Sequence, residues 1–325
     1  MKKLNSKKRF PFKRLRIPLF LILSSMVVGL IGCDKSSTAP PYTYPEATLE
    51  LLLKEDSTSF SCPEWAASGN IYYIASRKET IFELWELDPG AGSKRFIKEG
   101  VVGPLAVSRD GKIAALLENT KTVVVMDSTG EIVWEKEPEF LIVSLAFSSD
   151  NQGLYLYGEP GGYAPKPIIF FSLNDSTQVD TLLQDAGPFK ISSNDSFLIY
   201  TKETTEGGNP IHTFYKYEIK TEMEYLILKV NHTEGFDINP VSHDLLALGK
   251  RGDGEEQFLG RRILLYHMDV SIGNIFEAHP YEESYIYLCS WSPEGERISI
   301  VVTPFIPGNP IIPLPSEIWI VKDIL

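Results

Sequence analysis

Short apolar runs, either alternating or continuous, recur along the chain and predict β-strands throughout. One clear case is the stretch WSPEGERISI at positions 291–300, where a large apolar residue precedes a Ser, a turn and an alternating strand. Five more hairpins share this design, and they begin at Trp65, Val107, Phe147, Ile191 and Ile238. Because no segment keeps a helical period, the pattern predicts an all-β fold built from hairpins.

The hairpins recur every 40 to 53 residues, which makes the chain a set of repeats. After most hairpins comes a third strand that ends in an acidic or amide residue, then a short turn and a fourth strand. The sixth copy lacks its fourth strand, and the stretch ATLELLLK at 47–54 precedes the first hairpin as a spare strand. Four-stranded units of this length around an axis are typical of β-propellers. We therefore predict six four-stranded antiparallel blades over residues 47–325, closed by the N-terminal strand, with Trp291 packed between blades.

The hairpins with a Ser and an acidic-Gly turn resemble the WD-like repeats of TolB-like six-bladed propellers. The resemblance is best in WSPEGERISI and in VSRDGKIAAL at 107–116, and it extends over residues 47–325. Repeat five departs from the pattern, because Asn239-Pro240 stands where Ser-Pro is expected. Similar blades precede the catalytic domain of prolyl-oligopeptidase-like peptidases, but the sequence contains no G-x-S-x-G motif, which excludes that reading.

The N-terminus has the pattern of an export signal. Residues 1–16 hold eight Lys or Arg and no acid, and residues 17–31 form an apolar run. The sequence LIGC that ends at Cys33 resembles a bacterial lipobox, which implies that Cys33 is lipidated and becomes the first residue of the mature protein. An ordinary signal peptide or N-terminal anchor that contains a Cys is the alternative.

The predicted organisation has three parts: a signal peptide at 1–32, the lipidated Cys33 with a flexible tether at 33–46, and the propeller at 47–325. The tether is rich in Ser, Thr and Pro, as flexible linkers are. This organisation predicts a protein of the bacterial cell envelope, anchored to a membrane by lipid and facing the periplasm or the exterior. The choice between inner and outer membrane stays open.

Charge narrows the range of partners. Removal of the predicted signal leaves 23 basic and 43 acidic residues, a net charge of −20. Such a surface repels phosphate backbones, which argues against nucleic acid as a partner. We expect a monomer that contacts the membrane through its lipid and binds an envelope protein or a glycan; an acidic surface that serves only solubility is the other reading of the charge.

Motifs of catalytic and cofactor sites are scarce. The sequence contains no H-E-x-x-H, C-x-x-C, P-loop or dinucleotide glycine motif, and its five His residues have no metal-ligand spacing. We therefore predict no catalytic residues, no metal and no cofactor. Cys62 and Cys289 fall in the predicted innermost strands of the first and last blades, where they are either a disulfide that locks the ring in an oxidising compartment or two buried free thiols.

Loop length gives the only indication of a binding face. The connections between second and third strands are short in blades one and two and long in blades three to six, where GNPI occurs twice. Equivalent loops of a propeller emerge on one face, and aromatic and Pro-stiffened loops suit binding. We predict that the chain is a protein- or ligand-binding or scaffold module that uses Tyr163, Asn209, Phe305 and Asn309. The alternatives are loops without function, a purely structural envelope component, and a propeller enzyme, such as a glycan lyase or hydrolase, with acidic residues at the channel mouth.

Overall fold

The computed structural model describes the repeat region of the chain. The described residues are 48–77, 80–118, 122–159, 166–175, 179–206, 209–231, 233–250, 262–277, 281, 284–306 and 312–324. They lie within residues 45–325, which form one compact unit. The predicted signal peptide, Cys33 and the tether lie outside the described residues and stay predictions. Among the residues that are described, no helix has the length and apolar character needed to cross a bilayer.

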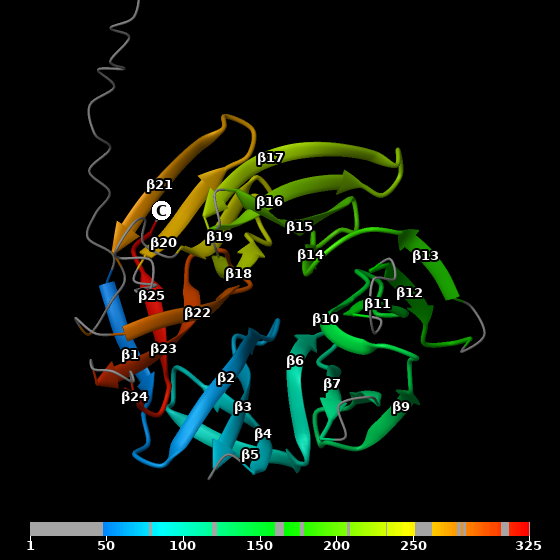
Figure 1. Cartoon of the computed structure of the whole chain (residues 1–325). Coiled ribbons are helices and arrows are strands. Elements are labelled where there is room, and N and C mark those ends of the chain that lie inside the picture. Colours follow the sequence, from blue (N-terminus) through cyan, green and yellow to red (C-terminus); the bar gives the residue numbers. More distant parts are fainter. Residues whose placement is uncertain are drawn as a thin grey trace, which may run out of the picture. The chain divides into compact units, whose positions relative to one another are not determined.

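Six antiparallel sheets surround a central axis, and each is one blade (Figure 1). Blade one is β2 (Thr58–Trp65), β3 (Ile71–Arg77), β4 (Ile81–Asp88) and β5 (Ser93–Glu99), and blade two is β6 (Val101–Val107), β7 (Ile113–Leu117), β8 (Val123–Met126) and β9 (Ile132–Lys136). Blade three is β10 (Leu141–Phe147), β11 (Gly153–Glu159), β12 (Ile168–Ser172) and β13 (Val179–Leu183), and blade four is β14 (Phe189–Ile191), β15 (Phe197–Glu206), β16 (Asn209–Glu218) and β17 (Met223–Asn231). Blade five is β18 (Thr233–Ile238), β19 (Leu245–Lys250), β20 (Arg262–His267) and β21 (Ile272–Glu277). The predicted fold class is confirmed.

Blade six is closed by the N-terminal strand, as predicted. Its sheet has the order β22 (Ser284–Trp291), β23 (Ile298–Ile306), β25 (Glu317–Lys322) and β1 (Thr48–Leu53), and β24 (Ile312–Pro313) pairs with β23. Strand β1 runs antiparallel to β25, with Thr48 opposite Lys322. The two ends of the propeller thereby share one sheet, which leaves no unpaired edge at which the ring could open.

Apolar contacts between neighbouring blades hold the ring together. The buried apolar residues form six clusters in the described part of the chain, one at each blade interface. Trp291 is 3 % exposed and packs with Leu245 and Ile263 of blade five, so its predicted place between blades is confirmed. Burying a large apolar side chain contributes roughly 1.5–3 kcal/mol, so each of these interfaces stabilises the ring.

The repeated Ser of the hairpins is a buried turn residue. The hydroxyl of Ser108 accepts a hydrogen bond from the Lys112 N–H at 2.7 Å and donates one to the Asp110 carboxylate. Its counterparts Ser148, Ser192 and Ser292 are buried in the same way. In blade five Asn239 takes this place, and its side-chain amide also donates to the Gly295 carbonyl of blade six at 2.8 Å. The departure seen in repeat five therefore adds a bond between blades.

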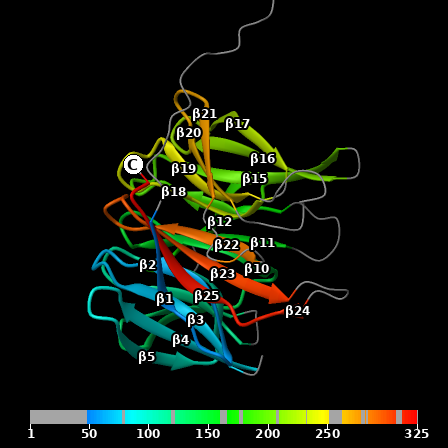
Figure 2. The same ribbon diagram turned by 90° about the vertical axis from the view of Figure 1, so that its left-hand side faces the viewer.

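Two predicted loops are partly sheet. The predicted loop 303–316 of blade six contains the end of β23 and the strand β24, with Phe305 opposite Pro313. The segment 202–212 of blade four is predicted to be a long loop, but β15 and β16 stay paired as far as Glu206 and Asn209. Its residues Lys202 to Glu206 continue the cross-strand ladder because their Thr-rich run is a good strand former. In Figure 2 the far ends of β15 and β16 and the short strand β24 extend toward the same side of the molecule, as expected for equivalent connections. We call this the loop side, and the side of the Ser turns the turn side.

Candidate functional site: a charged layer in the central channel

The inner strands β2, β6, β10, β14, β18 and β22 bring one equivalent residue each to the axis. These residues stand two positions before the turn residue of each repeat, and together we call them the axial layer: Glu64, Ala106, Ala146, Lys190, Asp237 and Ser290. In β2, β6 and β22 the register shifts immediately before this position. Such bulges redirect side chains locally, and here they directly precede the axial layer in blades one, two and six.

Three charged residues of the axial layer meet across the channel. The Lys190 ammonium of blade four lies 2.7 Å from Glu64 Oε1 of blade one, the blade opposite in the ring, and 3.8 Å from Asp237 Oδ1 of blade five. Ser290 of blade six donates its hydroxyl to Glu64 Oε2 at 3.1 Å. Asp237 Oδ2 accepts the Trp291 N–H at 2.8 Å. One cluster therefore joins blades one, four, five and six at the axis.

The cluster holds two carboxylates for one ammonium, and its side chains are mostly buried. The side chains of Glu64, Lys190 and Asp237 are 21 %, 25 % and 15 % exposed. Burial raises the pKa of Asp237 to about 6, with Glu64 adding to the rise and the Lys190 charge opposing it. Burial alone would lower the pKa of Lys190, but Asp237 and Glu64 outweigh it and the net direction is upward. Lys190 thus stays charged, and the layer carries excess negative charge once Asp237 ionises.

On the loop side the axial layer forms the floor of a cavity of about 350 Å³, the loop-side chamber. Its walls are mainly apolar, and they include Leu105, Val143, Leu145, Phe189 and Phe236. Cavities of a few hundred cubic ångströms with apolar walls and a few polar groups are the usual form of small-ligand sites.

At two glycines around this chamber, the backbone lies so close to a neighbouring residue that no side chain would fit. A Cβ on Gly187 would lie 2.0 Å from the carbonyl oxygen of Thr201, a residue that also lines the chamber. A Cβ on Gly103 would lie 2.3 Å from the Cys62 sulfur. Gly103 precedes Pro104 of β6, and Gly187 precedes Pro188, which lies directly before β14. The close contacts at the channel wall explain the glycine in both Gly-Pro pairs.

On the turn side a second, more polar cavity of about 200 Å³ begins, the turn-side chamber. Glu64, Leu145 and Lys190 line both chambers, so the ion pair lies at the boundary between them. Ala106 and Ala146 line the turn-side chamber at the level of the layer. Their methyl groups are small, which leaves space beside the ion pair on the side of blades two and three.

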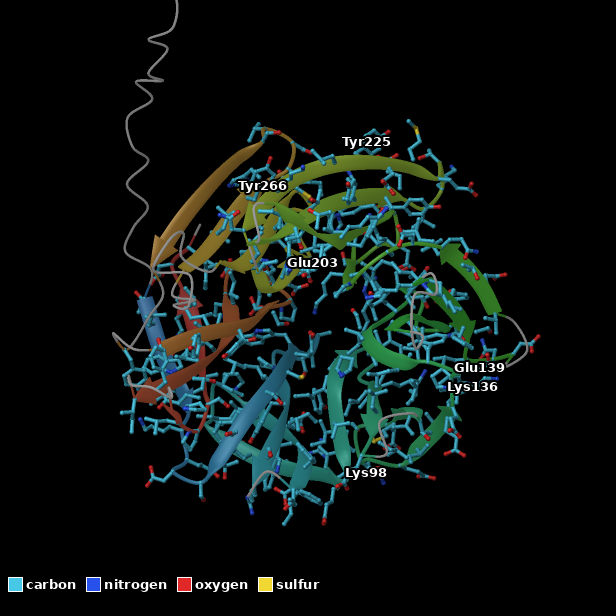
Figure 3. All side chains as sticks on the ribbon, in the orientation of Figure 1. Lys98, Lys136, Glu139, Glu203, Tyr225 and Tyr266 are labelled. Carbon is cyan, nitrogen blue, oxygen red and sulfur yellow. The ribbon has the colours of Figure 1, made fainter. Side chains whose placement is uncertain are left out.

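The loop-side rim of the channel carries a second acid–base contact. His212 of β16 lines the loop-side chamber, and its Nδ1 accepts the Thr233 N–H at 3.3 Å. Its Nε2 lies 3.7 Å from the Glu203 carboxylate. Figure 3 places Glu203 on the inner side of blade four, whereas Tyr225, Lys98 and Lys136 lie at the outer rim.

Of the four predicted binding residues, one can be placed in full. Phe305 is 6 % exposed, and the centroid of its ring lies 4.8 Å from that of Tyr285; its role in binding stays a prediction. It forms a wall of a separate cavity of about 480 Å³ beside Tyr281 and Glu317. Asn209 is the first residue of β16 rather than a loop residue. The side chain of Asn209, together with Tyr163 and Asn309, lies outside the described residues.

Glu317 is the centre of a second buried charged group, which we call the closure cluster. It is 2 % exposed and lies 2.7 Å from the Lys54 ammonium. The hydroxyl of Tyr281 and the indole N–H of Trp319 donate to the same carboxylate at 2.9 Å. Hydrogen bonding to Glu317 raises the pKa of the half-exposed Lys54 above its usual value. The cluster joins the N-terminal segment to blade six at the seam of the ring.

The predicted disulfide gains no support from the position of Cys62. Cys62 is unpaired in this structure and packs against Gly103 beside the apolar cluster between blades one and two. Burial raises the pKa of the Cys62 thiol to about 11, which keeps it protonated and unreactive. The side chain of Cys289 lies outside the described residues, so the pairing itself stays a prediction.

The axial layer was missed in the sequence, although a signal for it exists. Aligned on their turns, three of the six inner strands carry a charged residue at the same position: Glu64, Lys190 and Asp237. A charge at one position in three inner strands of a closed ring indicates that those charges meet at the axis. Within the described part of the chain, no group of three or more His, Cys, Asp or Glu could hold a metal ion.

Comparison with known proteins supports the fold and goes no further. No family model matches the sequence, and no curated protein matches it. A solved structure of hydrazine synthase from Kuenenia stuttgartiensis is similar with a TM-score of 0.53 at 13 % identity, over 78 % of each chain. At this identity the likeness shows the fold alone.

Two further structures are similar at lower scores. TolB from Acinetobacter baumannii has a TM-score of 0.40 at 15 % identity, over 83 % of this chain and 56 % of that one. An oligogalacturonate lyase in complex with manganese has a TM-score of 0.49 at 9 % identity, over 86 % of this chain and 97 % of that one. Scores of this size support no statement about the function of this chain.

Proposed function

We propose that this protein is a lipid-anchored, extracytoplasmic binding module of the bacterial cell envelope, and that its site is the loop-side chamber. The observation that carries the proposal is an apolar-walled cavity of about 350 Å³ on the axis, with a charged pair at its floor. Apolar walls supply affinity through burial, and a few convergent polar groups supply orientation and specificity.

The position of the cavity also favours binding. Inner strands of five blades line it, so its walls are set by the rigid ring rather than by loops. A preformed site loses little conformational entropy when its ligand enters. The rim lies on the loop side, toward which the far ends of β15 and β16 and the strand β24 extend.

A tryptophan at Val143 tests the site directly. Val143 is 37 % exposed and lines the chamber, so an indole there fills the cavity without entering an interface between blades. Val133 of β9 is 55 % exposed and belongs to an outer strand, which makes Val133→Trp a matched control. A panel of small amphipathic amines, acids and alcohols is screened by saturation-transfer NMR. We expect some of these compounds to bind the wild type and Val133→Trp but not Val143→Trp. Binders that Val143→Trp retains would place the site elsewhere.

The membrane anchor has its own test. Cys33→Ala removes the predicted lipid attachment site while leaving the propeller unchanged. We expect the wild type to be found in the membrane fraction and to be labelled by radioactive palmitate. We expect the variant not to be labelled. Equal labelling of both proteins would contradict lipidation at Cys33.

A further inference from the structure

We propose that the channel selects an organic cation, with its apolar body in the loop-side chamber and its ammonium group at the axial layer beside Glu64. This inference rests on the proposed function, because it names the class of ligand for the same chamber. The required elements are an apolar cavity, a carboxylate that its ligand can reach, and space for a head group next to that carboxylate.

The charge balance of the axial layer favours a cation over an anion. Lys190 is within 4 Å of both Glu64 and Asp237, so one ammonium serves two carboxylates. An incoming cation balances the second carboxylate, whereas an incoming anion would place a third negative charge in a mostly buried cluster. Charges that leave water without a partner are strongly disfavoured, so the layer discriminates against anions.

The channel has space for a head group at the level of the carboxylates. Two of the six layer positions are alanines, Ala106 and Ala146, and both are contributed by neighbouring blades. The small side chains leave the side of the channel facing Glu64 and Lys190 unfilled, and the two chambers border each other there. An ammonium group entering from the loop side meets the Glu64–Lys190 pair, because both residues line both chambers, and the second carboxylate, Asp237, lies just beyond that pair on the turn side.

The net charge of the whole molecule also favours a cation. Outside the predicted signal the chain has 23 basic and 43 acidic residues. A strongly negative protein attracts cations and concentrates them at clefts with low-dielectric walls. Local and global electrostatics therefore favour the same class of ligand.

Three probes of equal chain length separate charge from hydrophobicity. Hexylammonium, hexanol and hexanoate carry the same alkyl chain and differ in the head group. Isothermal titration of the purified full chain at pH 7.5 and low salt is expected to show hexylammonium binding about tenfold more tightly than hexanol, and hexanoate more weakly than either.

Two variants locate the head group. Asp237→Asn removes the excess charge of the layer and keeps its shape, so hexylammonium is expected to lose its advantage over hexanol. Ala146→Leu fills the space beside the ion pair, and we expect it to weaken hexylammonium about tenfold more than it weakens hexanol. A purely structural role of these residues would change the binding of both probes equally, and thermal unfolding of each variant shows that it is folded.

The outcomes separate this inference from the proposed function. If hexanoate or hexanol binds best, and Val143→Trp still abolishes that binding, the chamber is a binding site but the cation inference is wrong. If hexylammonium binds equally to the wild type and to Val143→Trp, both the site and the inference are wrong.

Discussion

Two buried Lys–carboxylate groups of this propeller look alike and differ in their charge balance. In the closure cluster one carboxylate, Glu317, faces one ammonium and two neutral donors. In the axial layer two carboxylates share the Lys190 ammonium. The closure cluster is complete within the protein, as expected of a device that holds the ring shut. Both groups border cavities, but the axial layer has one carboxylate more than it has ammonium groups, as expected of a site that awaits a ligand.

Removal of the two lysines should separate the clusters most strongly. Lys190→Met leaves Glu64 and Asp237 without a counter-charge in a mostly buried position, which should cost about 3–5 kcal/mol of unfolding free energy. Lys54→Met leaves the 2 % exposed Glu317 carboxylate with the neutral donors of Tyr281 and Trp319, so it should cost about 1–2 kcal/mol, less than Lys190→Met. Urea unfolding at pH 7.5 measures both. Equal losses in the two variants would remove the distinction between the clusters.

The pH dependence of stability should reveal the excess charge. Because the pKa of Asp237 is raised to about 6, the folded protein binds this proton more tightly than the unfolded chain does. The stability from this group is therefore complete below about pH 4 and is lost as pH rises through about 6. Asp237→Asn lacks this loss, so it should exceed the wild type by on the order of 2 kcal/mol at pH 8. Parallel stability curves for the two proteins between pH 4 and 8 would show that Asp237 carries no such charge penalty.

Neutralising Glu317 in the closure cluster or Glu64 in the axial layer should change the free energy of unfolding least, and the two changes should differ in size. Glu317→Gln removes the charge that Lys54, Tyr281 and Trp319 all contact, and should cost about 1–2 kcal/mol. Glu64→Gln leaves Lys190 with Asp237 as a balanced pair, and should change stability by less than about 1 kcal/mol. Thermal unfolding measures the two variants side by side. A larger loss for Glu64→Gln than for Glu317→Gln would reverse the comparison.

The sequence predicted the ring better than it predicted the site. Blade number, closure by residues 48–53 and the place of Trp291 all follow from local patterns: the Ser turns, the apolar strands and one missing strand in the last repeat. The Gly and Pro residues of segment 202–212 predict a loop, whereas in the structure β15 and β16 stay paired there. The contact between Lys190 and Glu64 joins opposite blades, and no local pattern reports which side chains a closed ring brings together across its axis.

One titration tests the central claim most directly. Hexylammonium is added to the full chain, to Asp237→Asn and to Glu317→Gln at pH 7.5, with hexanol as the reference ligand. The account predicts that Glu317→Gln keeps the roughly tenfold preference for the cation and that Asp237→Asn loses it. The same preference in all three proteins would show that the axial layer does not select the ligand.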